Sequence, residues 1–477
     1  MSNVKHYLWS AIGKFGTELI SFIGNILVAR ILIPEDYGLV AMVSIFITLC
    51  MSFTDAGFND GLIRKNNCDK YDIGTVATYN ILVALLLYSI MYFSAPLIAN
   101  FFNRDELIGV TRVLAIGVIL KSFTLSGFVQ LNKSLRFKTI TIINVICSIS
   151  ALTVVYILAL NGYRYWALVM QPIIIAILNI ISLLVIAKWK PYFCFKWKRF
   201  KEMFSFSSNL LVSYLITTIS NNIYGFIIGK FYSAGELGYY NQAQKMQTIP
   251  TQGINNVVLS TSYPIFAKES NPNKRYALYV SLFKRYNFII TFLVFLLIGI
   301  SDLVFLVVFS EKWLPSAPLF RIFMFLALTY PMMTINANIV KIHGKSNLYR
   351  NLAFFRSTLL IIALIICSPF SLETIIVGQV VAAFLSVSVD MYVCGKTIGF
   401  TISKQYTLWL KILWKPLFIF IVTKFISCLI CTSIVASTTF FFLIYCLCFV
   451  VLCEMLHDCT YKEFKSAIIL MLRNKKS

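Results

Sequence analysis

The sequence is poor in charged residues, and this shortage excludes most kinds of soluble protein. Asp, Glu, Lys and Arg make up 13% of the 477 residues, whereas soluble domains carry about 25%. Acidic residues are especially few, with 19 Asp and Glu against 42 Lys and Arg, and histidine occurs three times. Hydrophobic residues account for 59% of the chain. This composition predicts an all-α integral membrane protein, because helices satisfy their own backbone hydrogen bonds in lipid.

Motifs for catalysis and ATP binding are also missing from the sequence. It contains no Walker loop and no nucleophile–base–acid set, and no histidine lies in the middle of an apolar run. The one C-x-x-C pair, Cys428 and Cys431, stands in an apolar run without a second pair or a nearby histidine. We therefore expect a transporter and not an enzyme. We expect no metal or other cofactor, while coupling to H⁺ or Na⁺ stays open as an energy source.

Long apolar runs fill most of the chain. A transmembrane helix needs about 20 such residues, and windows of this length predict about fourteen spans with short loops. The eighth span is polar and the thirteenth holds three lysines, so a count of twelve is the alternative. The predicted spans are 7–32, 38–58, 74–93, 107–131, 139–160, 165–187, 203–229, 237–266, 286–309, 317–341, 347–366, 372–393, 408–431 and 433–455.

The loops between these spans alternate in positive charge. With the N-terminus inside, the inner loops and their borders hold 29 Lys and Arg, and the outer loops hold 5. Cytoplasmic loops of membrane proteins are enriched in these residues. The alternation predicts a multi-pass protein of the cytoplasmic membrane with both termini in the cytoplasm. It also explains the net charge of +23 without a nucleic-acid partner.

An internal similarity occurs at an offset of 200 residues. Segment 30–38 (RILIPEDYG) aligns without gaps with segment 230–238 (KFYSAGELG), so that a base, an acid and a glycine coincide. Each segment follows the first span of a six-span block, as expected for a transporter built from repeated halves. We predict an N-terminal bundle at 1–200, a repeated bundle at 201–400, an extra helix pair at 401–456 and a basic cytoplasmic tail at 457–477.

Polar residues recur inside several spans, where lipid contact would be costly. They follow one helical stripe in the first span and continue in the seventh and eighth, which are rich in hydroxyls and amides. Sugar binding and helix packing are both open explanations for the amides. Glu18 and Asp55 are possible ion-coupling acids. In-span cations outnumber acids, which suits an anionic substrate; they are Arg112, Lys121, Arg321, Arg356, Lys411, Lys415 and Lys424, against Glu18, Asp55, Asp302 and Asp390. For Lys121, Lys411 and Lys415 we expect instead that the side chain reaches to the nearer membrane surface.

Three segments resemble polysaccharide flippases of the Wzx type. They are 27–42 (LVARILIPEDYGLVAM), 55–65 (DAGFNDGLIRK) and 237–245 (LGYYNQAQK), the last continuing to 262–267. The resemblance is to the superfamily that includes MATE multidrug exporters and the lipid II flippase. It implies two six-helix bundles in a V and a cationic cavity lined by spans 1, 2, 7 and 8. Those spans supply six expected substrate contacts: Lys14, Asn25, Asn209, Asn221, Gln242 and Lys245.

The same resemblance implies a function. The expected substrate is an undecaprenyl-pyrophosphate-linked oligosaccharide, flipped by alternating access to the outer leaflet for O-antigen, capsule or exopolysaccharide assembly. Membrane lipids and other polysaccharide assembly proteins are the expected partners, and the last helix pair would flank a groove for the lipid tail. Two alternatives are a cation-coupled MATE-type exporter, which predicts an acid-lined cavity, and a glycan polymerase or ligase, which predicts a large outer loop.

Overall fold

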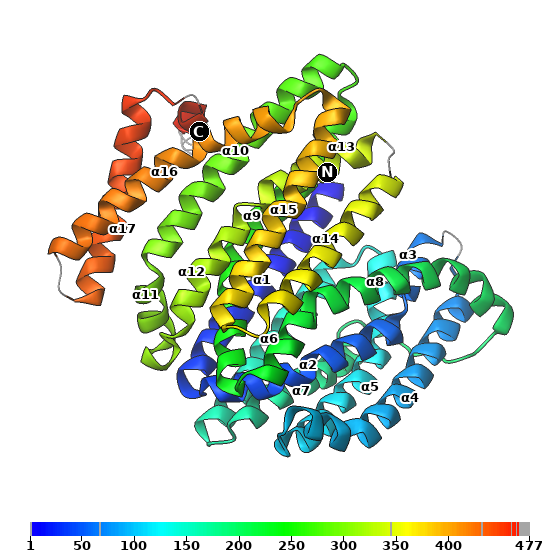
Figure 1. Ribbon diagram of the computed structural model, residues 1–477. Helices are drawn as coiled ribbons and strands as arrows, with labels where there is room; N and C mark the ends of the chain where they lie inside the picture. The colour runs from blue at the N-terminus through cyan, green and yellow to red at the C-terminus, as the bar shows by residue number, and fades with distance from the viewer. Residues whose placement is uncertain are drawn as a thin grey trace. The chain divides into compact units, whose positions relative to one another are not determined.

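A computed structural model describes residues 2–65, 68–343, 346–430, 433–458, 460–463 and 465–466. The secondary structure of these residues is helical, with no strand among them, as the composition predicts. The chain forms two compact units, Met1–Asn241 and Gln242–Ser477. Figure 1 draws the first unit in blue to green and the second in green to red.

The first unit contains eight helices and the start of a ninth. Within it α4 packs on α5, α1 packs on α6, and α2 packs on α8. The helices are α1 (Ser2–Ile31), α2 (Pro34–Asp55), α3 (Phe58–Arg64), α4 (Lys70–Phe102), α5 (Glu106–Lys133), α6 (Phe137–Leu160), α7 (Tyr165–Val185), α8 (Trp197–Phe231) and α9 (Ala234–Lys268).

The second unit begins within α9 and ends with an antiparallel helix pair. Here α14 packs on α15, α10 packs on α16, and α16 lies beside α17 (Figure 1). The helices are α10 (Pro272–Gly299), α11 (Ser301–Leu303), α12 (Ser316–Ala327), α13 (Tyr330–Ile342), α14 (Ser346–Cys367), α15 (Leu372–Ile398), α16 (Ile402–Ile430) and α17 (Ile434–Met455). A π-helical turn at Val304–Phe309 and a 3-10 turn at Glu311–Trp313 connect α11 to α12.

Within the described residues the predicted spans fall on helical segments, and three of them show differences with a clear backbone cause. The second span begins and ends earlier than predicted: α2 starts at Pro34, and the left-handed conformations of Ala56 and Gly57 end it at Asp55. The ninth begins earlier, since Pro272 is at a position that suits a helix start. The tenth is divided into α12 and α13 just before Pro331, whose ring cannot continue a helix from the preceding turn.

Twelve helices in the described residues are long and apolar enough to cross a membrane. They do not include α1 or α9, the two helices of the first and eighth predicted spans. The multi-pass membrane class is therefore confirmed, and the count of fourteen stays a prediction.

The outward surface of α4 shows the environment that such helices require. Leu82, Leu86, Phe93 and Leu97 recur on one helical face and are 58–78% exposed. Several residues buried on this helix are small or polar, such as Ala84, Ala95 and the fully buried Asn80. Large apolar side chains outside and polar side chains inside are stable when the surroundings are hydrocarbon.

The turn before α2 and the turn before α9 are built in the same way. Asp36 accepts a hydrogen bond from the backbone N–H of Ile33 at 3.2 Å, and Glu236 accepts one from that of Ser233 at 2.9 Å. Each carboxylate satisfies a donor that a helix N-terminus leaves without a partner, and it lies where the helix dipole favours negative charge. The acid that repeats at an offset of 200 is thus a helix cap in both places.

The repeated glycines contact each other's helices reciprocally. A Cβ atom on Gly38 would overlap the carbonyl group of Ala234, and one on Gly238 would overlap the carbonyl group of Pro34. Positions 34 and 38 differ from 234 and 238 by 200 residues, so each helix start meets its counterpart through equivalent atoms. The reciprocal contact supports the predicted internal repeat, and it explains why both positions require glycine.

Candidate functional site

A cavity of about 320 Å³ lies between α2, α5 and α8 in the first unit. Its wall combines one carboxylate, Asp55, with one ammonium group, Lys121, and several hydroxyl groups. Asp55 is the last residue of α2, and the left-handed turn at Ala56 and Gly57 follows it. The hydroxyl-bearing residues of the wall are Thr48, Ser52, Thr54, Ser122, Tyr214 and Thr218.

Hydrogen bonds hold the two sides of this cavity together. The hydroxyl groups of Ser52 on α2 and Thr218 on α8 lie 3.2 Å apart, and the Tyr214 hydroxyl donates to the Asp60 carboxylate. The Lys121 side chain is exposed in the cavity wall, while the neighbouring Ser122 is buried and bonded to its own helix. The cavity therefore offers a cation and sugar-compatible hydroxyls within one structural unit.

The predicted site residues of the first unit have different environments. Asp55 lines the cavity, and Asn221 is exposed on α8, seven residues beyond Tyr214 and hence on the same helical face. Asn25 is buried on α1, and Glu18 is exposed on that helix. The side chains of Lys14 and Asn209 lie outside the described part of the structure. Lys121, which sequence reasoning assigned to the membrane surface, is the cavity residue that it missed.

The amides of α9 divide into two groups in the second unit. Three polar side chains of α9 bond to α13: Gln247 to Tyr330 at 3.3 Å, Asn255 to Thr334, and Ser262 to Asn338 at 2.8 Å. Helix packing thus explains this group. Gln242 is buried, whereas Lys245, Gln252 and Asn256 are exposed at spacings of seven and four, which places them on one face of α9.

Several in-span cations are neutralised by acids. Arg356 Nη2 lies 2.7 Å from Asp390 Oδ2 between α14 and α15, and Arg321 pairs with Asp302. Lys415 on α16 pairs with Asp458 after α17. These pairs reduce the positive balance expected in the membrane, and their cations serve structure. Lys121 is the cation that the described cavity of the first unit contains.

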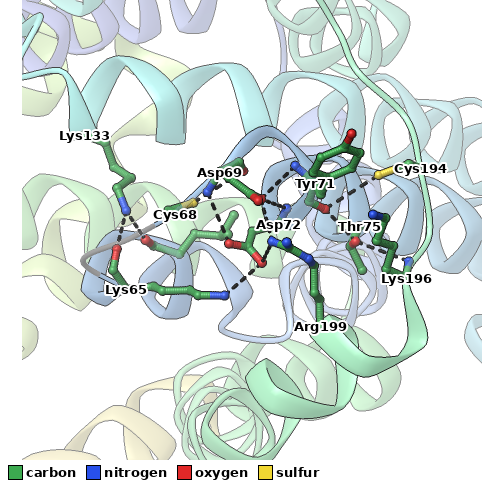
Figure 2. Close-up of polar contacts among 11 residues, drawn as sticks. Lys65, Cys68, Asp69, Tyr71, Asp72, Thr75, Lys133, Cys194, Lys196 and Arg199 are labelled. Atoms are coloured by element: carbon green, nitrogen blue, oxygen red, sulfur yellow. Dashed lines mark hydrogen bonds and ion pairs between the residues drawn. The ribbon is translucent and has the colours of Figure 1, made fainter.

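An ion cluster lies at the C-terminal end of α3, where residues of α3, α4, α5 and α8 and the adjoining loop meet (Figure 2). The Asp72 carboxylate is fully buried and accepts from Lys65 Nζ at 2.9 Å and from Arg199 Nη1 at 2.9 Å. Lys133 of α5 donates to the backbone carbonyls of Leu62 and Lys65, at the C-terminal end of α3. A cation there is favourable for the helix dipole.

Asp69 completes this cluster as the N-cap of α4. Its carboxylate accepts from the backbone N–H groups of Tyr71 and Asp72 at 2.9 Å, and from Arg199 Nη1 at 2.6 Å. These bonds, first that from the backbone of Asp72 and then those from Arg199, hold the pKa of Asp69 below its usual value. The sequence signal was the Asp69–Asp72 capping box, which predicts a helix start but not the basic partners.

These features define an all-helical membrane protein with a polar cavity of the kind found in transporters. A family model described as "Polysaccharide biosynthesis protein" matches residues 27–318. The chain belongs to this family, which confirms the resemblance seen in the sequence.

Curated relatives carry related names. The chain is 29% identical over 308 residues to "Teichuronic acid biosynthesis protein TuaB" of Bacillus subtilis, an alignment that covers 62% of each protein. It is 20% identical to "Lipopolysaccharide biosynthesis protein WzxC" of Escherichia coli, across 88% of this chain and 85% of that one. The chain thus spans under two thirds of TuaB and most of WzxC.

Solved structures share the fold. "Lipid II flippase MurJ, inward closed conformation" superposes with a TM-score of 0.70 at 17% identity, covering 94% of this chain and 100% of that one. An inward-facing "multidrug resistance MATE family transporter of the MOP superfamily" gives 0.59 at 14% identity, covering 80% and 94%. The MATE-like fold is therefore confirmed.

Proposed function

We propose that this chain is a flippase for undecaprenyl-pyrophosphate-linked oligosaccharide, working by alternating access in surface polysaccharide assembly. The cavity of the first unit is the observation on which the proposal depends. Lys121 supplies positive charge for the pyrophosphate, and the surrounding hydroxyls supply hydrogen bonds for sugar. Asp55 in the same wall is placed to take up and release a coupling H⁺ or Na⁺.

The other proposed contacts lie on polar helix faces within each unit. Asn221 continues the α8 face of Tyr214, and Lys245 belongs to the exposed polar face of α9. Lys14, Asn25, Asn209 and Gln242 stay in the proposal as sequence-based contacts. The charge alternation of the loops supports a bacterial cytoplasmic membrane with both termini inside, and the reciprocal glycines support two repeated bundles followed by the helix pair.

The two alternatives make different demands on the cavity and loops. A cation exporter requires an anionic, largely apolar cavity, whereas this one includes an ammonium group and six hydroxyl-bearing residues. A glycan polymerase or ligase requires a catalytic outer loop, and the sequence has none of suitable length. Both would still place the protein in a membrane, so the distinction needs a transport measurement.

The decisive experiment uses a deletion strain and its lipid-linked intermediates. Loss of the chain should abolish surface glycan and cause the lipid-linked repeat unit to accumulate in the inner leaflet, where externally added glycosidases cannot reach it. Full-length surface glycan in the deletion strain, with no second flippase gene, would overturn the proposal. So would resistance to cationic dyes as the sole phenotype of overexpression.

Variants of the cavity test its role within that strain. Lys121→Gln should lower glycan export at least tenfold, and Lys121→Arg should restore it, because the charge is what the pyrophosphate requires. Arg112→Gln is the matched control, since Arg112 lies on the same helix, α5, but contacts Tyr92 of α4 and does not line the cavity. Equal export by the Lys121→Gln and Arg112→Gln proteins, at equal abundance by immunoblot, would remove Lys121 from the site.

A further inference from the structure

A second cavity, of about 580 Å³, lies between the first halves of α10 and α16 in the second unit. Residues 276–285 of α10 and 400–411 before and along α16 form its walls, and Thr460 and Glu463 close one side. Lys284, Arg285, Lys404 and Lys411 bring four positive charges to this wall. This cavity shares no lining residue with the cavity of the first unit, and it is separate from the ion cluster described above.

The charges of this cavity are not balanced. Glu463 is the one carboxylate of the wall, and it is already paired with Arg285 at 2.9 Å. Within the described residues, no carboxylate forms an ion pair with Lys284, Lys404 or Lys411, and all three side chains are exposed. Three like charges around one hollow repel each other, so an anion between them is favoured.

The position of the lysines along the helices indicates the depth of this anion. Lys284 comes just before the predicted span 286–309, and Lys404 and Lys411 lie at the start of the predicted span 408–431. Cations at the ends of membrane spans lie at the level of the lipid phosphates. The inner wall is apolar: Phe400 is 4% exposed and packs edge-to-face on Tyr276 at 5.4 Å. This combination suits an amphipathic phosphate ester.

An exposed apolar stripe continues from the cavity along α16. Its members follow Lys411 at helical spacings of three and four, so they lie on the same face as Lys404 and Lys411. Their exposed fractions range from 38% to 71%. The stripe consists of Trp414, Phe418, Val422, Phe425 and Leu429.

We propose that this cavity binds the phosphate of an anionic phospholipid headgroup, with an acyl chain lying along the α16 stripe. The chemistry shared by all potential ligands is a phosphate group, which free pyrophosphate also provides. The stripe favours the lipid, because a soluble anion would gain nothing from it. The proposal does not depend on the flippase assignment, and binding can be measured without transport.

Native mass spectrometry of the purified full-length protein tests the proposal. Delipidated protein is titrated with long-chain phosphatidylglycerol, with phosphatidylcholine, with dihexanoyl phosphatidylglycerol and with sodium pyrophosphate. We expect one molecule of long-chain phosphatidylglycerol to bind tightly, and the other three compounds to bind more weakly. The variant Lys284→Gln/Lys404→Gln/Lys411→Gln should weaken that lipid about a hundredfold, since each lysine near a membrane surface contributes about fivefold.

Two matched variants control for charge and folding. Lys188→Gln/Lys198→Gln/Lys201→Gln removes three exposed charges of the first unit, none of which lines the cavity, and should bind as the wild type does. Lys284→Arg/Lys404→Arg/Lys411→Arg keeps the charges and should retain binding if the site is correctly assigned. Equal affinity for phosphatidylglycerol and phosphatidylcholine, or equal loss in both Gln triples, would overturn the proposal. Pyrophosphate binding as tight as that of the long-chain lipid would instead indicate a soluble-anion site and would also overturn it.

Discussion

Replacing Asp72 by asparagine should destabilise the first unit far more than the same change at Asp69, three residues earlier. The Asp72 side chain is 0% exposed and holds two cations, Lys65 and Arg199, in addition to the Asp69 backbone N–H. Removing one member of a buried ion cluster costs about 3–5 kcal/mol. Because the Lys65 and Arg199 side chains are 32% and 29% exposed, water would recover part of this loss. We therefore expect Asp72→Asn to lower the free energy of unfolding by about 2–3 kcal/mol.

Asp69→Asn is the matched control for this prediction. The Asp69 side chain is 46% exposed, and asparagine caps a helix about as well as aspartate does. The loss should stay within about 1 kcal/mol, as for exposed ion pairs. Unfolding of purified protein in mixed micelles, followed by tryptophan fluorescence, measures both values. A double-mutant cycle with Arg199→Gln should also give a coupling of at least about 1 kcal/mol at Asp72. Equal destabilisation by the two Asn variants would refute the assignment of a buried ion cluster.

Three further predictions concern packing and polar contacts. Gly38→Ala and Gly238→Ala should each lower the free energy of unfolding by about 2–3 kcal/mol in the same assay, because the added methyl group overlaps a backbone carbonyl. Gly225→Ala is the control and should not destabilise the protein, since its Cβ atom would lie 3.9 Å from Leu237 Cδ1. Equal effects of the three substitutions would contradict the close contact. Arg356→Gln should leave the Asp390 carboxylate buried without its partner and reduce the yield of folded protein. The double variant Arg356→Gln/Asp390→Asn should recover much of that yield. An unrecovered yield in the double variant would contradict a stabilising Arg356–Asp390 ion pair. Tyr279→Phe should cost about 1–2 kcal/mol, because the buried Tyr279 hydroxyl bonds to Asn336 at 2.6 Å and Gln405 at 3.0 Å; an unchanged midpoint would show that this network is not stabilising.

The helices could be predicted from the sequence because lipid imposes one length and one polarity on each span. The ends were harder to predict where backbone conformation decides them. Ala56 adopts a left-handed conformation that its side chain does not favour, so α2 stops three residues before the predicted end. Pro331 appeared inside an apolar window, and hydropathy alone does not detect the break that it makes between α12 and α13.

The site was harder to predict because it depends on which helices are neighbours. Periodicity places Gln247 and Asn255 on polar α9, but it does not show that Tyr330 and Thr334 of α13 satisfy them. Lys121 reads as a surface cation when α5 is considered alone, and it becomes a cavity residue once α2 and α8 pack beside it. Pairwise contacts of this kind are not encoded in the pattern of any single helix.

The reciprocal contact of Gly38 and Gly238 has a consequence for how the two halves change during evolution. A helix face toward lipid accepts many apolar side chains, so the two bundles of the predicted repeat can diverge in sequence there. At this turn each helix start presents bare backbone to the other, and a Cβ atom on Gly38 or on Gly238 would overlap the backbone carbonyl of Ala234 or of Pro34. Replacement of glycine is therefore disfavoured at both Gly38 and Gly238. Under the predicted internal repeat, this mutual constraint accounts for the match between residues 30–38 and 230–238.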